Sequence, residues 1–202
     1  MTEDERITKV NAAVKYLTLT AHQYLANPYR AICLTAIEAY WQGFGGAKHH
    51  HDYLGGLAVH TADVMRRCLD LSGATWTAIF PDDSRGVDLD VLLTAAYWHD
   101  YEKLSDYVWK DGQIETTQYA KHIGHVVGST YAFLQAARAM LAKPPITFSQ
   151  RDKLPKTDAI LHCMLSHHGR KEWGSPIEPA TSEAWILHAA DMMSSRAKES
   201  TL

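Results

Sequence analysis

The segment VDLDVLLTAAYWHD, residues 87–100, is an almost unbroken apolar helix pattern that ends in a histidine and an aspartate. The predicted buried face of this helix runs through Leu92 and His99 and continues to Lys103. Side chains of adjacent helical residues diverge by about 100°, yet both can reach one ion placed near the helix end. His99 and Asp100 therefore have positions that suit a metal site. A helix end that simply becomes polar would explain the same two residues, so the rest of the chain decides between the two interpretations.

The other segments read as helix after helix, with apolar residues three and four positions apart. The first helix opens with a capping-box pattern, Thr2 followed by Glu5. Asp111 and Gly112 separate two short β-prone runs and indicate a hairpin. We therefore expect an all-α bundle of about seven helices with one small β-hairpin near residues 107–116. The predicted helices cover residues 2–26, 28–42, 57–71, 87–100, 121–141, 158–168 and 182–200.

The composition bounds the class of protein and its location. The chain has 202 residues, of which 46% are hydrophobic, enough for one domain with a real core. No apolar run approaches the roughly 20 residues of a membrane span, and the acidic start MTEDERITKV is not a signal peptide. The three cysteines are far apart and form no CxxC pair, which is typical of a reduced cytosol. We expect a cytoplasmic protein with no membrane partner.

The charge balance bears on the substrate. The formal net charge is −3 with histidine neutral, which argues against a broad basic face for duplex DNA. A nucleotide held by metal ions remains compatible with that balance, because bound divalent cations would be the largest local charges. The chain has 12 histidines against 4 phenylalanines. Histidine is the commonest metal ligand, so their placement matters more than their number.

Histidines and aspartates recur on the apolar faces of different predicted helices. His60 lies between Leu57 and Val64 on one such face, where burial without a partner would cost about 1–3 kcal/mol. A lone case would be a satisfied core histidine, but it is not alone. His122 and His125 share another face, where one is a candidate ligand and the other is either a bystander or a group that supports a ligand. The full set of candidates is His60, His99, Asp100, His125, His167, His168 and Asp191.

These candidates have the arrangement of a metal site in a helical bundle, where ligands project inward from facing helices. Five histidines and two aspartates exceed the needs of one ion, and Asp100 could bridge two. Mixed nitrogen and oxygen ligation suits Mn, Fe, Co, Ni or Zn better than Mg or Ca. We therefore expect two divalent transition-metal ions as cofactors.

The order H…HD…H…HH…D resembles the HD-domain superfamily of metal-dependent phosphohydrolases in its two-metal form. More narrowly, HHDYLGGLAVHT at residues 50–61 and LSHHGRKEWGSP at residues 165–176 are similar to the YhaM-type 3′→5′ exoribonuclease branch. The resemblance covers residues 48–197 and leaves residues 1–47 unmatched. It implies a single HD domain over residues 1–202, with an N-terminal helical pair at 1–47 and a metal-binding core at 48–197.

The resemblance also implies roles for individual residues. Lys103 occupies the lysine position of the HD-x-G-K pattern and would contact a phosphate oxygen, as would Arg196. His50 and His51 match positions near the mouth of the site and would touch substrate. Asp100 and Lys103 are therefore the expected catalytic residues. One ion would be held by His60, His99, Asp100 and Asp191, and the other by Asp100, His125, His167 and His168.

Two departures from the family pattern affect the expected substrate. The family usually has glycine where this chain has Glu102, and an acid there would tune the site or repel phosphate. YhaM-type enzymes also carry an OB-type nucleic-acid-binding module ahead of the HD domain, and nothing in this sequence is long or β-rich enough to be one. This difference favours a short substrate over a long polynucleotide.

The predicted function is two-metal hydrolysis of a phosphodiester or phosphoanhydride bond in a nucleotide or a short single-stranded RNA or DNA, in the manner of a 3′→5′ exonuclease. Within hydrolases the alternatives are a nucleotidase, a dNTP triphosphohydrolase and a cyclic-nucleotide phosphodiesterase. In other classes they are an HD-type di-iron oxygenase and a non-catalytic binding domain. The sequence leaves open whether the chain forms a homo-oligomer. Four aromatic residues suit either base stacking or packing: Tyr53, Tyr101, Trp109 and Trp173.

Overall fold

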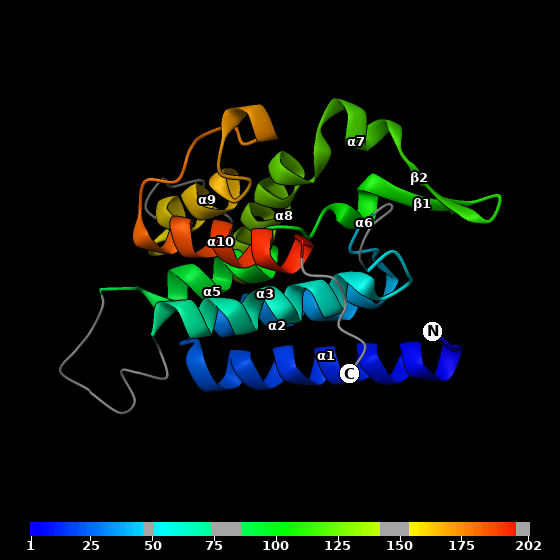
Figure 1. Ribbon diagram of the computed structural model, residues 1–202. Coiled ribbons are helices and arrows are strands. Elements are labelled where there is room, and N and C mark those ends of the chain that lie inside the picture. Colours follow the sequence, from blue (N-terminus) through cyan, green and yellow to red (C-terminus); the bar gives the residue numbers. More distant parts are fainter. Residues whose placement is uncertain (47–50, 74–85, 142–153, 197–202) are drawn as a thin grey trace.

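The computed structural model describes residues 1–46, 51–73, 86–141 and 154–196. Within these ranges it is a helical bundle with one two-stranded sheet, which confirms the predicted all-α class and hairpin (Figure 1). Seven of the described helices have nine or more residues. The elements are α1 (Glu3–Tyr24), α2 (Tyr29–Ile37), η1 (Glu38–Gln42), α3 (Gly56–Ser72), α5 (Leu89–Trp98), α6 (Lys103–Asp106), β1 (Tyr107–Lys110), β2 (Gln113–Thr116), α7 (Gln118–His122), α8 (Gly124–Leu141), α9 (Thr157–Ser166), η2 (Lys171–Trp173) and α10 (Ser182–Arg196).

Helix α5 lies in the interior of the bundle. Every residue from Val91 to Trp98 is buried, and the side chain of Asp88 caps the helix by accepting a hydrogen bond from the backbone NH of Val91. Helices α2, α3, α9 and α10 all pack against α5. An apolar helix surrounded in this way is the arrangement that its sequence pattern requires. The two polar residues that follow it, His99 and Asp100, are consequently carried into the interior.

The long helices form successive layers around α5. Helix α1 packs on α3, α3 packs on α10, and α9 lies between α10 and α8 (Figure 1). The capping box predicted at the start of α1 is present, with both the Thr2 and the Glu5 side chains bonded to backbone NH groups. Val10 and Leu17 of α1 are fully buried in the core. No helix in the described part of the chain combines the length and the apolar character that a bilayer-spanning segment needs.

The hairpin projects from one side of the bundle, where Figure 1 shows β1 and β2 extending away from α6. Tyr107 pairs with Thr116 and Lys110 with Gln113 in antiparallel register. The turn residues Asp111 and Gly112 both have positive φ, as the tight turn between two paired strands requires. The predicted position and turn of the hairpin are therefore confirmed.

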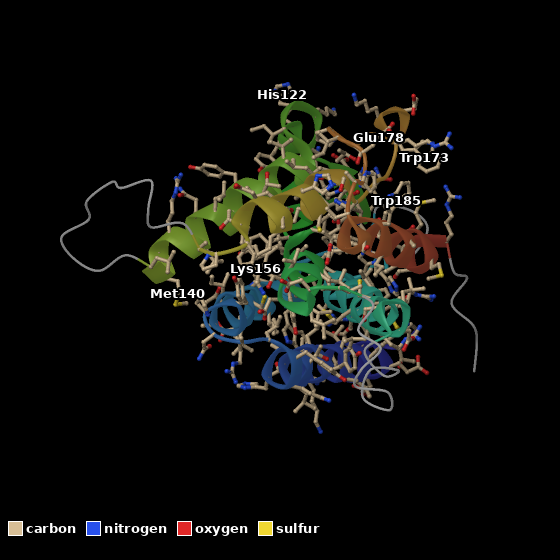
Figure 2. All side chains as sticks on the ribbon, turned by 90° about the vertical axis from the view of Figure 1, so that its left-hand side faces the viewer. His122, Met140, Lys156, Trp173, Glu178 and Trp185 are labelled. Atoms are coloured by element: carbon tan, nitrogen blue, oxygen red, sulfur yellow. The ribbon has the colours of Figure 1, made fainter. Side chains whose placement is uncertain are left out.

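The predicted helix over residues 121–141 differs from the structure at its start. Gly124 has a φ of +70°, so α7 ends at His122 and a separate helix, α8, begins at Gly124. Glycine adopts this backbone conformation without the steric cost that a side chain would add. His122 is left on the exposed end of α7, near the upper edge of the molecule in Figure 2. His122 and His125 therefore do not share a helical face, which corrects the prediction.

Candidate metal centre

Five helices bring the seven predicted ligand residues to one region of the bundle. His60 comes from α3, His99 and Asp100 follow α5, His125 is near the start of α8, and Asp191 comes from α10, with the pair His167 and His168 directly after α9. Their ligand atoms form two groups, each with all such atoms within 4.8 Å of one another. The first group is His60, His99, Asp100 and Asp191, and the second is His125, His167 and His168.

The Asp100 carboxylate lies between the two groups. Its Oδ2 atom is 3.1 Å from His60 Nε2 and 3.3 Å from His99 Nε2. Its Oδ1 atom is 3.4 Å from His125 Nε2 and 3.7 Å from His167 Nε2. Each oxygen therefore faces one group. This is the geometry that a carboxylate shared by two cations would have, although its role as a ligand stays a prediction.

The hydrogen bonds of two buried histidines test whether the site fits a metal. His99 Nδ1 donates to the carbonyl oxygen of Ala96 at 2.9 Å, and His167 Nδ1 donates to that of Met164 at 2.6 Å. A carbonyl oxygen only accepts, so Nδ1 carries a proton in both rings, and the neutral form of either ring has its lone pair on Nε2. No hydrogen-bond donor among the described residues reaches either Nε2 atom. Buried nitrogen lone pairs next to carboxylate oxygens fit a divalent transition-metal ion.

The electrostatics of the site keep its carboxylates charged and one of its histidines neutral. Burial by itself would raise the pKa of Asp100, but the nearby Lys103 ammonium and His99 hold it well below its usual range. Burial lowers the pKa of His167, and the neighbouring His168 and His99 lower it further. A neutral imidazole and an ionised carboxylate are the forms that bind metal ions.

Lys103 is anchored beside the Asp100 carboxylate. Its Nζ atom is 2.6 Å from Asp100 Oδ2 and donates a hydrogen bond to the carbonyl oxygen of Gly45 at 2.9 Å. The side chain is largely buried. The predicted contact of Lys103 with a phosphate oxygen stays a prediction, and the structure places its charge next to the first group of ligands.

The sequence interpretation missed two residues that hold the candidate ligands in place. Asp106 Oδ2 accepts hydrogen bonds from His125 Nδ1 at 2.8 Å and from the His125 backbone NH at 3.1 Å. Ser194 Oγ is 3.1 Å from His60 Nδ1 and also hydrogen-bonds Asp63. Metal-binding histidines usually donate their second ring NH to such a group, so a partner was to be expected. The sequence carries no signal that identifies which residue it is.

The other predicted substrate residues are His50, His51 and Arg196. His51 is buried, with its ring centroid 6.1 Å from that of His60. Arg196 is exposed at the last residue of α10. His50 lies outside the described residues. The roles of all three stay predictions.

Glu102 stands where the resembling family has glycine, and its side chain is directed toward α7 and α8. Its carboxylate hydrogen-bonds the Tyr119 hydroxyl, and its backbone NH donates to Ser129 Oγ at 2.9 Å. Gly128 provides the space for this arrangement, because a Cβ atom there would collide with the Tyr119 hydroxyl and lie 3.0 Å from Glu102 Cγ. Glu102 is therefore held by hydrogen bonds to residues of α7 and α8.

The candidate aromatic residues fall into two environments. Tyr101 packs against Trp98, with ring centroids 4.7 Å apart, and Tyr53 lies beside His51. Trp109 and Trp173 are exposed. Trp109 of β1 stacks on Phe44, and the guanidinium of Arg170 lies over the Trp173 ring. Of these four rings, those of Trp109 and Trp173 have the most accessible surface for a nucleobase.

The curated proteins compared with this chain are named as members of one class, the 3′-5′ exoribonucleases. The particular relatives are YhaM proteins. The YhaM of Shouchella clausii is 28% identical over 158 residues, which cover 76% of this chain and 42% of the relative. Those of Listeria welshimeri and Bacillus velezensis are each 27% identical, over 72% and 74% of this chain and 40% and 41% of their own lengths. The predicted resemblance to the YhaM-type proteins is confirmed.

This chain spans about two fifths of the length of the curated relatives that it matches. No protein-family model and no solved structure matches it.

Replacing Asp106 with alanine should weaken metal binding by about 10- to 100-fold, because His125 would lose the partner that fixes its ring. The measurement is Mn²⁺ affinity by isothermal titration calorimetry. Asp106→Asn, which keeps an acceptor oxygen, should lose less. Asp4→Ala, at an exposed position of α1, is the control and should bind like the parent protein. Equal affinity of Asp106→Ala and the parent would show that Asp106 does not support a ligand.

Replacing Gly128 with alanine should lower the thermal unfolding temperature, although alanine by itself favours a helix interior by about 0.5–1 kcal/mol. The new methyl group would meet the Tyr119 hydroxyl and Glu102, and overpacking of this kind costs about 1–3 kcal/mol. Adding Tyr119→Phe should recover part of the loss, since it removes the nearest atom. A Gly128→Ala variant that unfolds at or above the parent temperature would contradict this explanation.

Proposed function

We propose that this chain is a metal-dependent phosphodiesterase that removes nucleotides from the 3′ end of short single-stranded RNA. The observation that carries the proposal is the Asp100 carboxylate, with one oxygen directed to each of two histidine-containing groups. The similarity to YhaM proteins supports the choice of RNA and of the 3′ end. The proposal includes a single HD domain with its metal-binding core at residues 48–197.

Two divalent transition-metal ions, when bound, would polarise the phosphate and lower the pKa of an attacking water. His60, His99 and Asp191 would hold one ion, His125, His167 and His168 the other, and Asp100 both. The water oxygen forms a bond to phosphorus, and the bond from phosphorus to the 3′-oxygen of the preceding nucleotide breaks. That oxygen leaves with a proton, and the product is a nucleoside 5′-monophosphate.

The residues of the chain have distinct tasks in this step. Asp100 keeps the two groups of ligands at a fixed separation, since each of its oxygens faces one of them. Lys103 places a positive charge beside the site where negative charge gathers on the phosphate. His50, His51 and Arg196 would contact the substrate at the mouth of the site.

A water nucleophile agrees with the state of the cysteines. Cys33, Cys68 and Cys163 are free and buried. Burial raises the pKa of the Cys163 thiol to about 12 and also raises those of the other two. A thiolate nucleophile is therefore not provided by these residues. Free, buried thiols also suit the reducing conditions of the cytoplasm, which is where we expect the protein to work.

Exposed cations beside the second group of ligands favour a phosphate-bearing strand. Arg170 and Lys171 follow His168 within three residues, and both are exposed. The chain as a whole carries a net charge of −3, and the exposed Glu172 follows directly, so the positive charge here is confined to Arg170 and Lys171. A short single strand needs only such a local surface, whereas duplex DNA is bound by a broad one.

The test is incubation of the Mn²⁺-loaded protein with short 5′-labelled RNA. Products should shorten by one nucleotide at a time from the 3′ end, and Asp100→Ala should abolish turnover and greatly reduce bound metal, because both ions lose a ligand. His122→Ala is the matched control, since this histidine is exposed on α7, and it should retain activity.

Other outcomes of this experiment would replace the proposal. Full activity of Asp100→Ala would refute the site. Cleavage of free nucleotides but not of RNA would identify a nucleotidase. Consumption of O₂ by the iron-loaded protein, with no phosphate ester cleaved, would identify a di-iron oxygenase.

A further inference from the structure

A cavity lies directly beside the second group of candidate ligands. Its volume is about 370 Å³, within the range of small-molecule pockets. His125 is both part of its wall and a member of that group. Gly174 lies on another wall, and a Cβ atom there would be only 3.5 Å from His168 Nδ1. The cavity therefore borders the candidate metal centre at two histidines.

The walls of the cavity suit a neutral group better than a phosphate. Five apolar residues contribute to the lining: Ala120, Ile123, Val126, Val127 and Pro176. The described lining contains a carboxylate, Asp106, and neither lysine nor arginine. An anion would therefore be repelled from the cavity, while the cations that attract it lie on the side of the metal centre. A ligand that spans the two regions would place its phosphate at the metal centre and its uncharged part in the cavity.

Asp106 lines the cavity, and one oxygen of its carboxylate has no hydrogen-bond partner among the described residues. Its Oδ2 atom is occupied by His125. Its Oδ1 atom is buried, and no donor among the described residues reaches it. The residue as a whole is only 4% exposed. A buried acceptor without a partner is costly, and a carboxylate can be satisfied only by a donor such as a hydroxyl group.

We infer that this cavity receives the nucleoside at the 3′ end of the RNA, with Asp106 accepting a hydrogen bond from a ribose hydroxyl and the apolar wall packing against the base. The inference rests on the proposed function, because that function places the phosphate of this nucleotide between the two groups of ligands. The cavity would then set which end of the strand enters and would favour ribose over a sugar without hydroxyl groups.

The first test fills the cavity without touching the ligands. Ala120 lies on the α7 side of the wall, and Ala120→Phe would occupy part of the space. Ala139→Phe is the matched control, because Ala139 is exposed on α8 and is not part of the wall. With Mn²⁺ and short RNA, Ala120→Phe should raise KM at least about tenfold while bound metal stays unchanged. Val127→Phe, at a more exposed position of the wall, is the second variant if Ala120→Phe folds poorly.

Binding of adenosine 5′-monophosphate separates this inference from the proposed function. Isothermal titration calorimetry on the Mn²⁺-loaded proteins requires no turnover. The parent and Ala139→Phe should bind with equal affinity, and Ala120→Phe at least about tenfold more weakly. If the parent cleaves no RNA, the proposed function fails, and this binding difference still decides for or against the cavity. Equal affinity of the two phenylalanine variants would overturn the inference.

The sugar preference is tested with RNA whose 3′-terminal nucleotide is 2′,3′-dideoxy. The parent protein should degrade it with a kcat/KM about 10- to 100-fold lower than that for unmodified RNA, since the hydrogen bond to a charged acceptor is lost. Equal rates on both substrates would show that Asp106 does not recognise the ribose.

Discussion

The Asp100 carboxylate is a negative charge held at the buried end of an apolar helix, and the rest of the structure is arranged around it. Asp100 is only 2% exposed. A buried charge of this kind is costly unless cations and donors surround it. Lys103 lies within 2.6 Å, and ring nitrogens from α3, α8 and the end of α9 converge on its two oxygens. When these helices pack against α5, they also bring the candidate ligands together around Asp100.

Much of this arrangement could be predicted because periodicity determines which face of a helix is buried. The apolar pattern before His99 fixed the position of α5, and the spacing of His60 from Leu57 and Val64 placed that histidine in the interior. The hairpin turn followed from Asp111 and Gly112, whose backbone conformation few other residue pairs allow as readily. Local sequence patterns determine all of these features, so they can be predicted from a single sequence.

The features that could not be predicted from the sequence are contacts between different secondary-structure elements. Asp106 and His125 are 19 positions apart, and Ser194 and His60 are 134 apart, and no spacing rule joins either pair. The break before α8 depends on one backbone angle at Gly124, a residue that helices also tolerate at some cost. Glu102 is a similar case. Its direction is set by Tyr119 and by the room above Gly128, not by its neighbours in the chain.

Asp106 connects the two parts of the proposed mechanism. One oxygen of its carboxylate hydrogen-bonds His125, and the other, which is buried and has no partner among the described residues, is the acceptor that we propose for a ligand hydroxyl. A ligand hydroxyl bound to the second oxygen would fix the carboxylate and, through it, the ring of His125. Metal binding would in turn hold His125 and keep the acceptor in place. Because such coupling is reciprocal in free energy, each ligand should increase the affinity for the other. A single short side chain at the end of α6 would thus join substrate recognition to the assembly of the metal centre.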